Sequence, residues 1–191
     1  KIMVKNKIRK SLLEQGQLLS KEFIKESNIK IQNIAINEID IESSKNTLLY
    51  FPYKKEISVE LIIKTLWKYD NNIYMPRIVS KNKLKFNRLK KLEVLKKNKY
   101  GIKEITSSDY LSPMSFNTMF IPFVGIDKNG YRLGYGGGYF DRALQNVKKD
   151  NNKILIIGLG YEYQVVKGSF GEAHDIRYDA VITEKDIHFF K

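Results

Sequence analysis

A glycine-rich stretch, residues 130–142, is the part of the sequence best suited to chemistry. Four glycines fall within the five positions 134–138, between an arginine and an aspartate. Because glycine has no Cβ, such a loop can adopt positive φ and turn successive N–H groups toward one phosphate. Arg132 and Arg142 add positive charge, and Asp141 offers an oxygen ligand for magnesium. The stretch predicts a phosphate-binding loop that contains Gly134, Gly136, Gly137 and Gly138.

Two better-known phosphate motifs do not fit these residues. A Walker A loop beginning at Gly134 requires Gly-Lys-Ser/Thr five residues later, where the sequence has Tyr139, Phe140 and Asp141. A dinucleotide-binding GxGxxG motif from the same glycine requires glycine at position 139. The alternative is a tight turn in which glycine provides only flexibility, and the flanking arginine and aspartate favour the phosphate-binding loop over it.

The elements beside the loop follow from hydrophobic periodicity. Residues 117–124 are mostly apolar and predict a buried strand. After the loop, a helix is predicted because apolar residues recur at helical spacing, namely Tyr139, Phe140, Ala143, Leu144 and Val147. The loop is therefore expected between a strand and the start of a helix, a position that favours an anion.

An N-terminal helix supplies two more basic residues. Residues 4–27 predict this helix, which Gly16 would divide. Lys5 and Arg9 are four residues apart and lie side by side on a helix, so both can reach one phosphate chain. A solvated basic face is the plainer interpretation of the same pair.

The remaining pattern alternates strands with helices. Strands are predicted over residues 46–51, 72–79, 84–89, 153–158 and 179–183, a helix from Ser58, a short helix over 90–97 and a loop over 106–116. This order favours an α/β fold, specifically a Rossmann-like three-layer sandwich around a mainly parallel sheet. We expect one domain over residues 1–191, with the helical segment 4–27 packed on its body. In such a fold ligands bind at the carboxyl edge of the sheet.

Composition limits the classes of function. The chain has 191 residues and no cysteine, which excludes disulfides, thiolate metal sites and a cysteine nucleophile. The N-terminal residues contain no apolar run like that of a signal peptide, and the longest apolar stretch, residues 154–159, is too short to span a membrane. We expect a cytoplasmic protein. The formal charge of +13 comes from scattered lysines and favours a solvated surface over a nucleic-acid site.

Residues 132–142, preceded by Pro122-Phe-Val-Gly-Ile-Asp127, resemble the signature of the 5-formyltetrahydrofolate cyclo-ligase family. Phe140 stands where the family usually has a second tyrosine. The resemblance implies ATP- and magnesium-dependent cyclisation of 5-formyltetrahydrofolate to 5,10-methenyltetrahydrofolate, with release of ADP and phosphate. Residues 100–104 resemble another family segment, but Lys103 replaces its proline, and no role is assigned to Glu104.

The resemblance also implies a set of site residues. It places Asp141 and Asp175 at the magnesium ion, and Phe51 and Glu56 at the folate. Arg132 and Tyr139 are the expected catalytic residues. The expected ATP-binding residues are Lys5, Arg9, Arg132, Gly134, Gly136, Gly137, Gly138, Tyr139 and Phe140.

Two other classes of function stay open. Another ATP-dependent kinase or ligase could use the same loop, and a basic RNA-binding module would fit the charge, although neither an RRM signature nor a GXXG clamp is found in a suitable context. The expected partners are a folate and ATP, without nucleic acid or membrane, and the expected state is a monomer.

Overall fold

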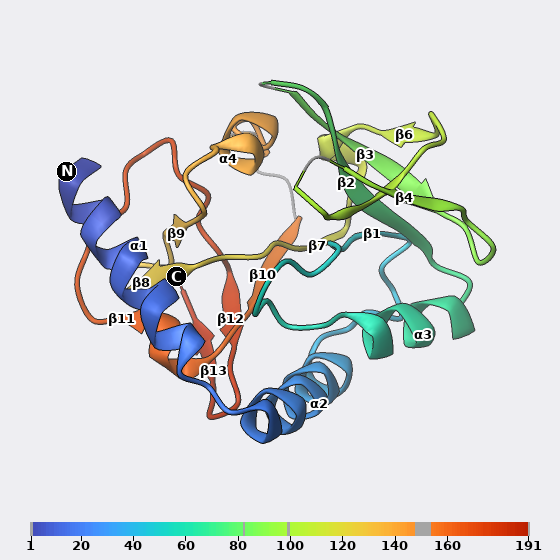
Figure 1. Ribbon diagram of the computed structural model, residues 1–191. Coiled ribbons are helices and arrows are strands. Elements are labelled where there is room, and N and C mark those ends of the chain that lie inside the picture. The colour runs from blue at the N-terminus through green and yellow to red at the C-terminus, as the bar shows by residue number, and fades with distance from the viewer. Residues whose placement is uncertain (1, 82, 99, 148–153, 191) are drawn as a thin grey trace.

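The computed structural model describes residues 2–81, 83–98, 100–147 and 154–190. An eight-stranded sheet runs through the molecule (Figure 1). In sheet order its strands are β13 (Ile187–Phe189), β12 (Ala180–Ile182), β10 (Leu155–Leu159), β7 (Thr118–Phe120), β1 (Asn46–Leu48), β2 (Asn72–Ser80), β3 (Lys83–Leu89) and β6 (Tyr110–Leu111). The five strands from β12 to β2 pair in parallel, and the other pairs are antiparallel. The expected α/β fold with a mainly parallel sheet is confirmed, and its Rossmann-like character stays a prediction.

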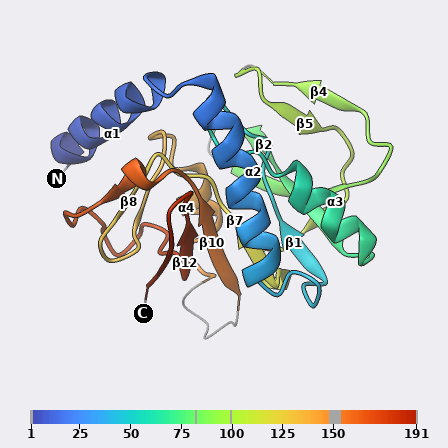
Figure 2. The ribbon, with the colours of Figure 1, turned by 90° about the horizontal axis from the view of Figure 1, so that it is seen from below.

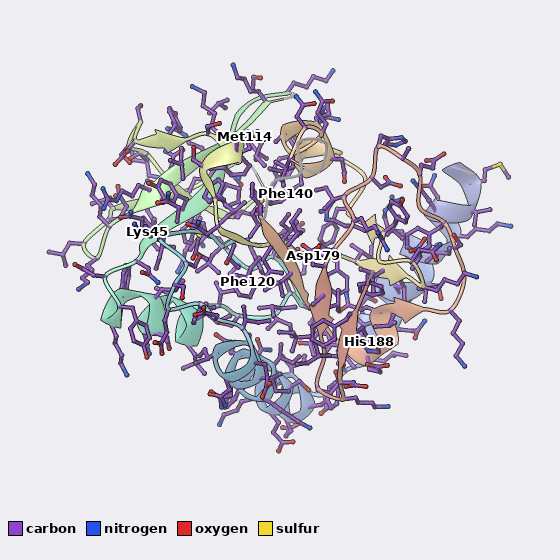
Figure 3. All side chains as sticks on the ribbon, turned by 180° about the vertical axis from the view of Figure 1, so that it is seen from behind. Lys45, Met114, Phe120, Phe140, Asp179 and His188 are labelled. Carbon is purple, nitrogen blue, oxygen red and sulfur yellow. The ribbon has the colours of Figure 1, made fainter. Side chains whose placement is uncertain are left out.

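Hydrophobic cores lie on both faces of this sheet. On one face α2 (Lys21–Glu38) and α3 (Glu60–Lys68) lie side by side and bury an apolar cluster that includes Ile31, Ile62 and Leu66 (Figure 2). The other face is covered by α4 (Tyr139–Ala143) and irregular segments, and its cluster includes Phe86 and Met119. Phe120 of β7 is fully buried and lies near the centre of the molecule (Figure 3).

Smaller elements surround the large sheet. A three-stranded sheet has the order β11 (Val165–Val166), β8 (Gly125–Asp127) and β9 (Arg132–Leu133), and α1 (Ile2–Gln17) packs against β8 and the 3₁₀ turn η2 (Glu162–Gln164). A hairpin joins β4 (Leu95–Lys97) to β5 (Lys103–Ile105), and a second 3₁₀ turn, η1, covers Pro113–Ser115.

The N-terminal helical segment differs from the expectation. It is divided into two helices as expected, but Gly16 lies inside α1 and the break comes after Gln17. The break falls before Ser20, because its hydroxyl accepts the Phe23 N–H and so caps α2. Helix α2 then continues to Glu38, well beyond the predicted end at residue 27.

Several other element boundaries were wrong. The predicted helix over 90–97 is absent: Leu92 and Val94 are exposed, and residues 95–97 form strand β4 because they pair with β5. The loop predicted over 106–116 contains β6 and η1. The strand predicted over 117–124 stays in the large sheet only through residue 120, and the helix predicted from Tyr139 ends at Ala143. Residue 153, the first of another predicted strand, lies outside the described residues.

Candidate active site

The glycine-rich loop does not directly follow a strand of the large sheet. After β7 the chain forms β8, a turn and β9 of the small sheet, and only then enters the loop. These strands are two or three residues long, too short to produce a periodic pattern in the sequence. The loop is therefore joined to the small sheet, against which α1 also packs.

Side chains from both directions hold the loop. The Arg9 Nε of α1 donates to the Gly134 carbonyl at 2.7 Å, and Arg142 Nη2 donates to the Gly137 carbonyl at 2.7 Å. Gly136 has φ +100° and Gly138 has φ +62°, so both adopt the left-handed region that favours glycine. The loop thus has a defined conformation, as a binding loop requires.

A polar cavity of about 280 Å³ lies between this loop and α1. Four basic side chains line it together with both aspartates predicted to bind magnesium. Its lining comprises Lys5, Arg9, Arg132, Leu133, Gly134, Gly136, Gly138, Asp141, Arg142, Gln145, His174 and Asp175. Most residues predicted to bind ATP are therefore brought together from three distant parts of the chain.

An apolar cavity of about 370 Å³ lies on the other side of the loop, at the carboxyl ends of β1 and β7. It contains both residues predicted to bind folate, Phe51 and Glu56. Tyr139, Phe140 and Gly137 also line this cavity and do not line the polar one. These three of the nine residues predicted to bind ATP therefore face the apolar cavity.

Arg132 lies between the two cavities and lines both. Its side chain is only 7% exposed, and Nε donates to the Pro122 carbonyl at 2.7 Å. Nη1 is 3.3 Å from an oxygen of Asp141, and the guanidinium lies 5.3 Å from the Phe140 ring centroid. These contacts hold a buried positive charge at the boundary between the polar and the apolar cavity.

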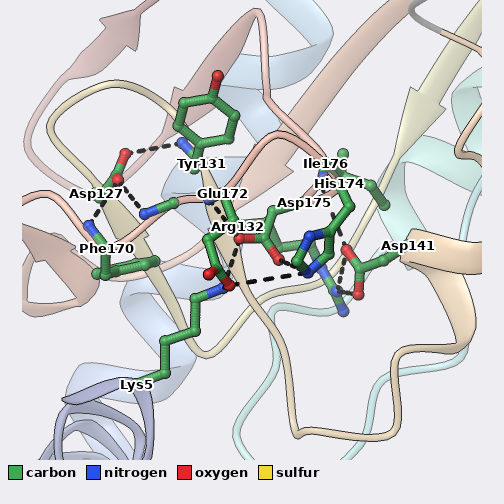
Figure 4. A network of polar contacts seen from close by, with 11 residues as sticks. Lys5, Asp127, Tyr131, Arg132, Asp141, Phe170, Glu172, His174, Asp175 and Ile176 are labelled. Carbon is green, nitrogen blue, oxygen red and sulfur yellow. Dashed lines mark hydrogen bonds and ion pairs between the residues drawn. The ribbon is translucent and has the colours of Figure 1, made fainter. Parts of the chain in front are cut away.

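The acidic residues of the polar cavity form a network with α1 (Figure 4). Lys5 Nζ donates to Asp175 at 2.6 Å and to Glu172 at 2.8 Å, and Asp175 also accepts the Glu172 N–H. Burial alone would lower the pKa of Lys5, but the hydrogen bonds with Asp175 and Glu172 outweigh it and raise that pKa. Lys5 therefore stays protonated and neutralises the two carboxylates.

Asp127 positions the segment that carries these carboxylates. It is fully buried, and its two oxygens accept the N–H groups of Asn129, Tyr131, Phe170 and Gly171 at 2.9 to 3.0 Å. Figure 4 shows the contacts with Tyr131 and Phe170. The carboxylate thus ties the turn between β8 and β9 to the loop before Glu172. Its function is structural, because backbone groups occupy both oxygens.

The donors fit a hard divalent cation. Asp141 and Asp175 line the same cavity, and ligand atoms of Glu172, His174 and Asp175 lie within 4.8 Å of one another. Magnesium prefers oxygen ligands and usually retains several waters. Lys5 contacts two of these carboxylates, so a cation there would displace the ammonium group toward the cavity.

Glu56 lies in the turn that follows β1. Its Oε2 accepts the Tyr53 N–H at 2.8 Å, and the Glu56 N–H donates to the Tyr53 carbonyl. Burial raises the pKa of Glu56 to about 7, although the Tyr53 hydrogen bond and the charge of Arg132 oppose this shift. The half-buried carboxyl group faces an apolar cavity, where it can accept hydrogen bonds from a ligand.

Three further residues lie at the site without a predicted role. Glu104, to which the sequence assigned no role because of Lys103, lines the apolar cavity, and its Oε1 accepts the Ile78 N–H at 3.2 Å and the Asn98 amide at 2.8 Å. Tyr135 lines the same cavity, and its position among glycines was a signal that the sequence offered. Glu172 had no signal, because only the fold brings it to Lys5.

Within the described ranges, no helix is both long and apolar enough to cross a lipid bilayer.

Comparisons with known proteins agree with one another. The profile of the 5-formyltetrahydrofolate cyclo-ligase family matches residues 1–184. A Haemophilus influenzae protein named 5-formyltetrahydrofolate cyclo-ligase is 36% identical over 146 residues, which cover 74% of this chain and 77% of that protein. A Mycoplasma pneumoniae protein of the same name is 28% identical, over 96% of this chain and 100% of its own. The NMR structure of Aquifex aeolicus 5,10-methenyltetrahydrofolate synthetase has a TM-score of 0.85 at 28% identity, covering 98% of this chain and 93% of that one.

Proposed function

The chain belongs to the 5-formyltetrahydrofolate cyclo-ligase family, and from this premise we propose how its two cavities share the reaction. The protein is an enzyme of this family and carries out the ATP-dependent conversion of 5-formyltetrahydrofolate to 5,10-methenyltetrahydrofolate. ATP phosphates occupy the polar cavity and the folate occupies the apolar one. The observation that carries this division is the buried guanidinium of Arg132, which lines both cavities.

The chemistry requires activation of a formyl amide, which is a poor electrophile. The γ-phosphoryl group of ATP is transferred to the formyl oxygen, and ADP leaves. N10 of the folate then attacks the activated carbon, and phosphate departs as the ring closes. Such transfers depend mainly on positioning and on neutralising charge.

Arg132 and Tyr139 are the proposed catalytic residues. Arg132 is placed to stabilise the negative charge of the transferring phosphoryl group, because its guanidinium is held at the boundary between the two substrates. Tyr139 follows Gly138 at the start of α4 and lines the folate side of the loop, where it can orient the formyl group.

The other basic residues bind the nucleotide. Lys5 and Arg9 reach the polar cavity from α1, and the loop of Gly134, Gly136, Gly137 and Gly138 offers backbone N–H groups, with Phe140 packed beneath Arg132. Asp141 and Asp175 would hold magnesium, which supplies charge neutralisation for the ATP phosphates. Lys5 now contacts Asp175 and Glu172, and with Asp175 at a metal its ammonium group would be free to meet a phosphate oxygen.

Glu56 and Phe51 bind the folate. The Glu56 carboxylate pairs with the donor edge of the pterin, and Phe51 packs against the ring system. The apolar cavity suits a flat heterocycle, because most of its lining is aromatic or aliphatic. We further propose a monomeric cytoplasmic enzyme whose partners are the folate and ATP, without nucleic acid.

The test is turnover of the purified protein with magnesium, ATP and 5-formyltetrahydrofolate. We expect a rise in near-ultraviolet absorbance from the methenyl product and stoichiometric ADP. Arg132→Ala should lower turnover by roughly 100-fold or more. Arg88→Ala removes an exposed arginine outside both cavities and should retain turnover. ATP hydrolysis that ignores the folate would instead favour another ATP-dependent kinase or ligase.

A further inference from the structure

A partition separates the apolar cavity from a third cavity of about 340 Å³ beneath α1. Lys54, Glu56 and Tyr135 line both of these cavities and form the partition. Lys54 and Glu56 belong to the turn after β1, whereas Tyr135 belongs to the glycine-rich loop, between Gly134 and Gly136. The partition is therefore built by the folate side and the nucleotide side together.

The two loops touch through aromatic rings. Tyr53 and Tyr135 pack edge to face, with ring centroids 5.3 Å apart and an interplanar angle of 72°. Lys54 Nζ lies 5.2 Å from the Tyr53 ring centroid and 5.6 Å from that of Tyr135. Edge-to-face pairs and cations near aromatic rings are both attractive contacts. The ammonium group thus reinforces the contact between the two rings.

Backbone strain accompanies this arrangement. Lys54 has φ +54°, in the left-handed region that a lysine rarely adopts. Such conformations persist only where the surrounding contacts hold them, and they concentrate at functional sites. Here the contacts are the hydrogen bond from the Glu56 N–H to the Tyr53 carbonyl and the two rings beside the lysine.

Each of the two residues in the Tyr53–Tyr135 ring contact is also connected to one of the proposed substrate sites. On the folate side, the Tyr53 backbone N–H donates to Glu56 Oε2 at 2.8 Å, so the residue that carries the ring also holds one oxygen of the carboxylate. On the nucleotide side, Arg9 holds the Gly134 carbonyl, and its guanidinium lies against Gly136. Tyr135 thus lies between two glycines of the phosphate-binding loop. Its ring contacts Tyr53, which in turn is hydrogen-bonded to Glu56.

We propose that Tyr135 is a positioning residue that couples the two substrate sites. Nucleotide bound by the glycine-rich loop fixes Tyr135, the ring contact fixes Tyr53, and Tyr53 fixes the carboxylate that meets the pterin. This inference rests on the proposed function, since it assigns the folate to the apolar cavity. Nucleotide therefore tightens folate binding, and by linkage folate tightens nucleotide binding by the same factor.

Calorimetry measures the coupling directly. The dissociation constant of 5-formyltetrahydrofolate is determined with and without β,γ-methylene-ATP and magnesium. We expect the wild type to bind the folate at least about 5-fold more tightly with the analogue. Tyr135→Ala should bring this ratio close to 1, whereas Tyr135→Phe, which retains the ring, should keep it. Tyr69→Ala, at an exposed tyrosine outside the cavities, is the matched control and should keep the wild-type ratio.

The ratio of the folate dissociation constants without and with the ATP analogue separates coupling from a general structural defect. Such a defect weakens folate binding equally in both conditions and leaves the ratio unchanged. Tyr53→Ala removes the same contact from the other side and should also abolish the coupling. A wild-type ratio in Tyr135→Ala, or a ratio of 1 in the wild type, overturns the inference while leaving the proposed function intact. A wild type that binds the analogue but no folate overturns the proposed function as well.

Discussion

Glu56 is the residue whose environment differs most from that of a surface carboxylate. Its pKa is raised to about 7 because it is buried, whereas in the unfolded chain it titrates at its usual value of 4.5. Between these values the folded protein holds a proton that the unfolded chain has lost. The folded state therefore loses stability as pH rises through this window.

Glu56→Gln should remove this dependence, since the amide keeps the shape and does not ionise. As pH rises from 5 to 8, we expect the free energy of unfolding of the variant to increase relative to that of the wild type, by up to about 3 kcal/mol. Urea unfolding at both pH values measures it. Glu60→Gln, at an exposed glutamate of the same segment, is the control for loss of one charge. An equal difference between wild type and Glu56→Gln at both pH values would contradict the assignment.

Among individual residues, the sequence identified those site residues that stand in or near a recognisable pattern. Gly136 and Gly138 were selected by type, and their left-handed φ agrees with the reason for selecting them. Glu172 could not be found in this way, because its contact with Lys5 joins positions 167 residues apart. No local signal encodes such a contact.

Among the elements, α3 shows how a start signal can mislead. This helix was predicted to begin at Ser58, a residue type that often caps helices, yet the Ser58 hydroxyl accepts the Glu60 N–H only at 3.4 Å and the helix begins at Glu60. The stronger bond comes from α2, where Gln32 Oε1 accepts the Leu61 N–H at 2.9 Å. Asn28 of α2 likewise accepts the Ser58 N–H. One helix thus caps the next, which the sequence around Ser58 could not predict.

Gln32→Ala should therefore destabilise the protein more than Ser58→Ala does. Gln32 is buried, and its loss leaves the Leu61 N–H without its side-chain acceptor, at a cost of about 1–3 kcal/mol. Ser58→Ala should cost less than the roughly 0.5–2 kcal/mol typical of a well-formed cap, because its hydroxyl accepts only at 3.4 Å. Chemical denaturation of both variants measures the two costs. A larger loss for Ser58→Ala would show that the local cap dominates after all.

The two longest strands of the large sheet were the most predictable elements, whereas its short outer strands β6 and β13 were not predicted. Residues 72–79 and 84–89 were placed within one residue of β2 and β3, because long runs of β-formers leave a clear pattern. The short strands β8, β9 and β4 were missed, since two or three residues cannot show periodicity. Their pairing depends on partners elsewhere in the chain.

At the scale of the whole molecule, the positive net charge can attract anionic substrates toward the site. The formal charge is +13, and Lys5, Arg9, Arg132 and Arg142 line one cavity. Both proposed substrates are anions, so a basic surface raises their local concentration and their rate of association. The lysine excess therefore has a use that requires no nucleic acid.

We expect kcat/KM for the folate to fall several-fold between 50 and 300 mM potassium chloride, because salt screens long-range attraction. The turnover number at saturating substrate should change little, since the contacts around Arg132 are buried. Steady-state kinetics at constant magnesium measures both quantities. A salt-independent kcat/KM would assign the lysines to solubility alone.

The contact of Lys5 with Asp175 also bears on how the protein is made. Because 170 positions separate the two residues, the polar cavity cannot assemble until the chain has left the ribosome as far as Asp175. Contacts of such long sequence separation carry a high loop-closure entropy and form late in folding. A nascent chain thus exposes α1 without its acidic partners until Glu172 and Asp175 have been synthesised, and the capacity to consume ATP arises only after that point.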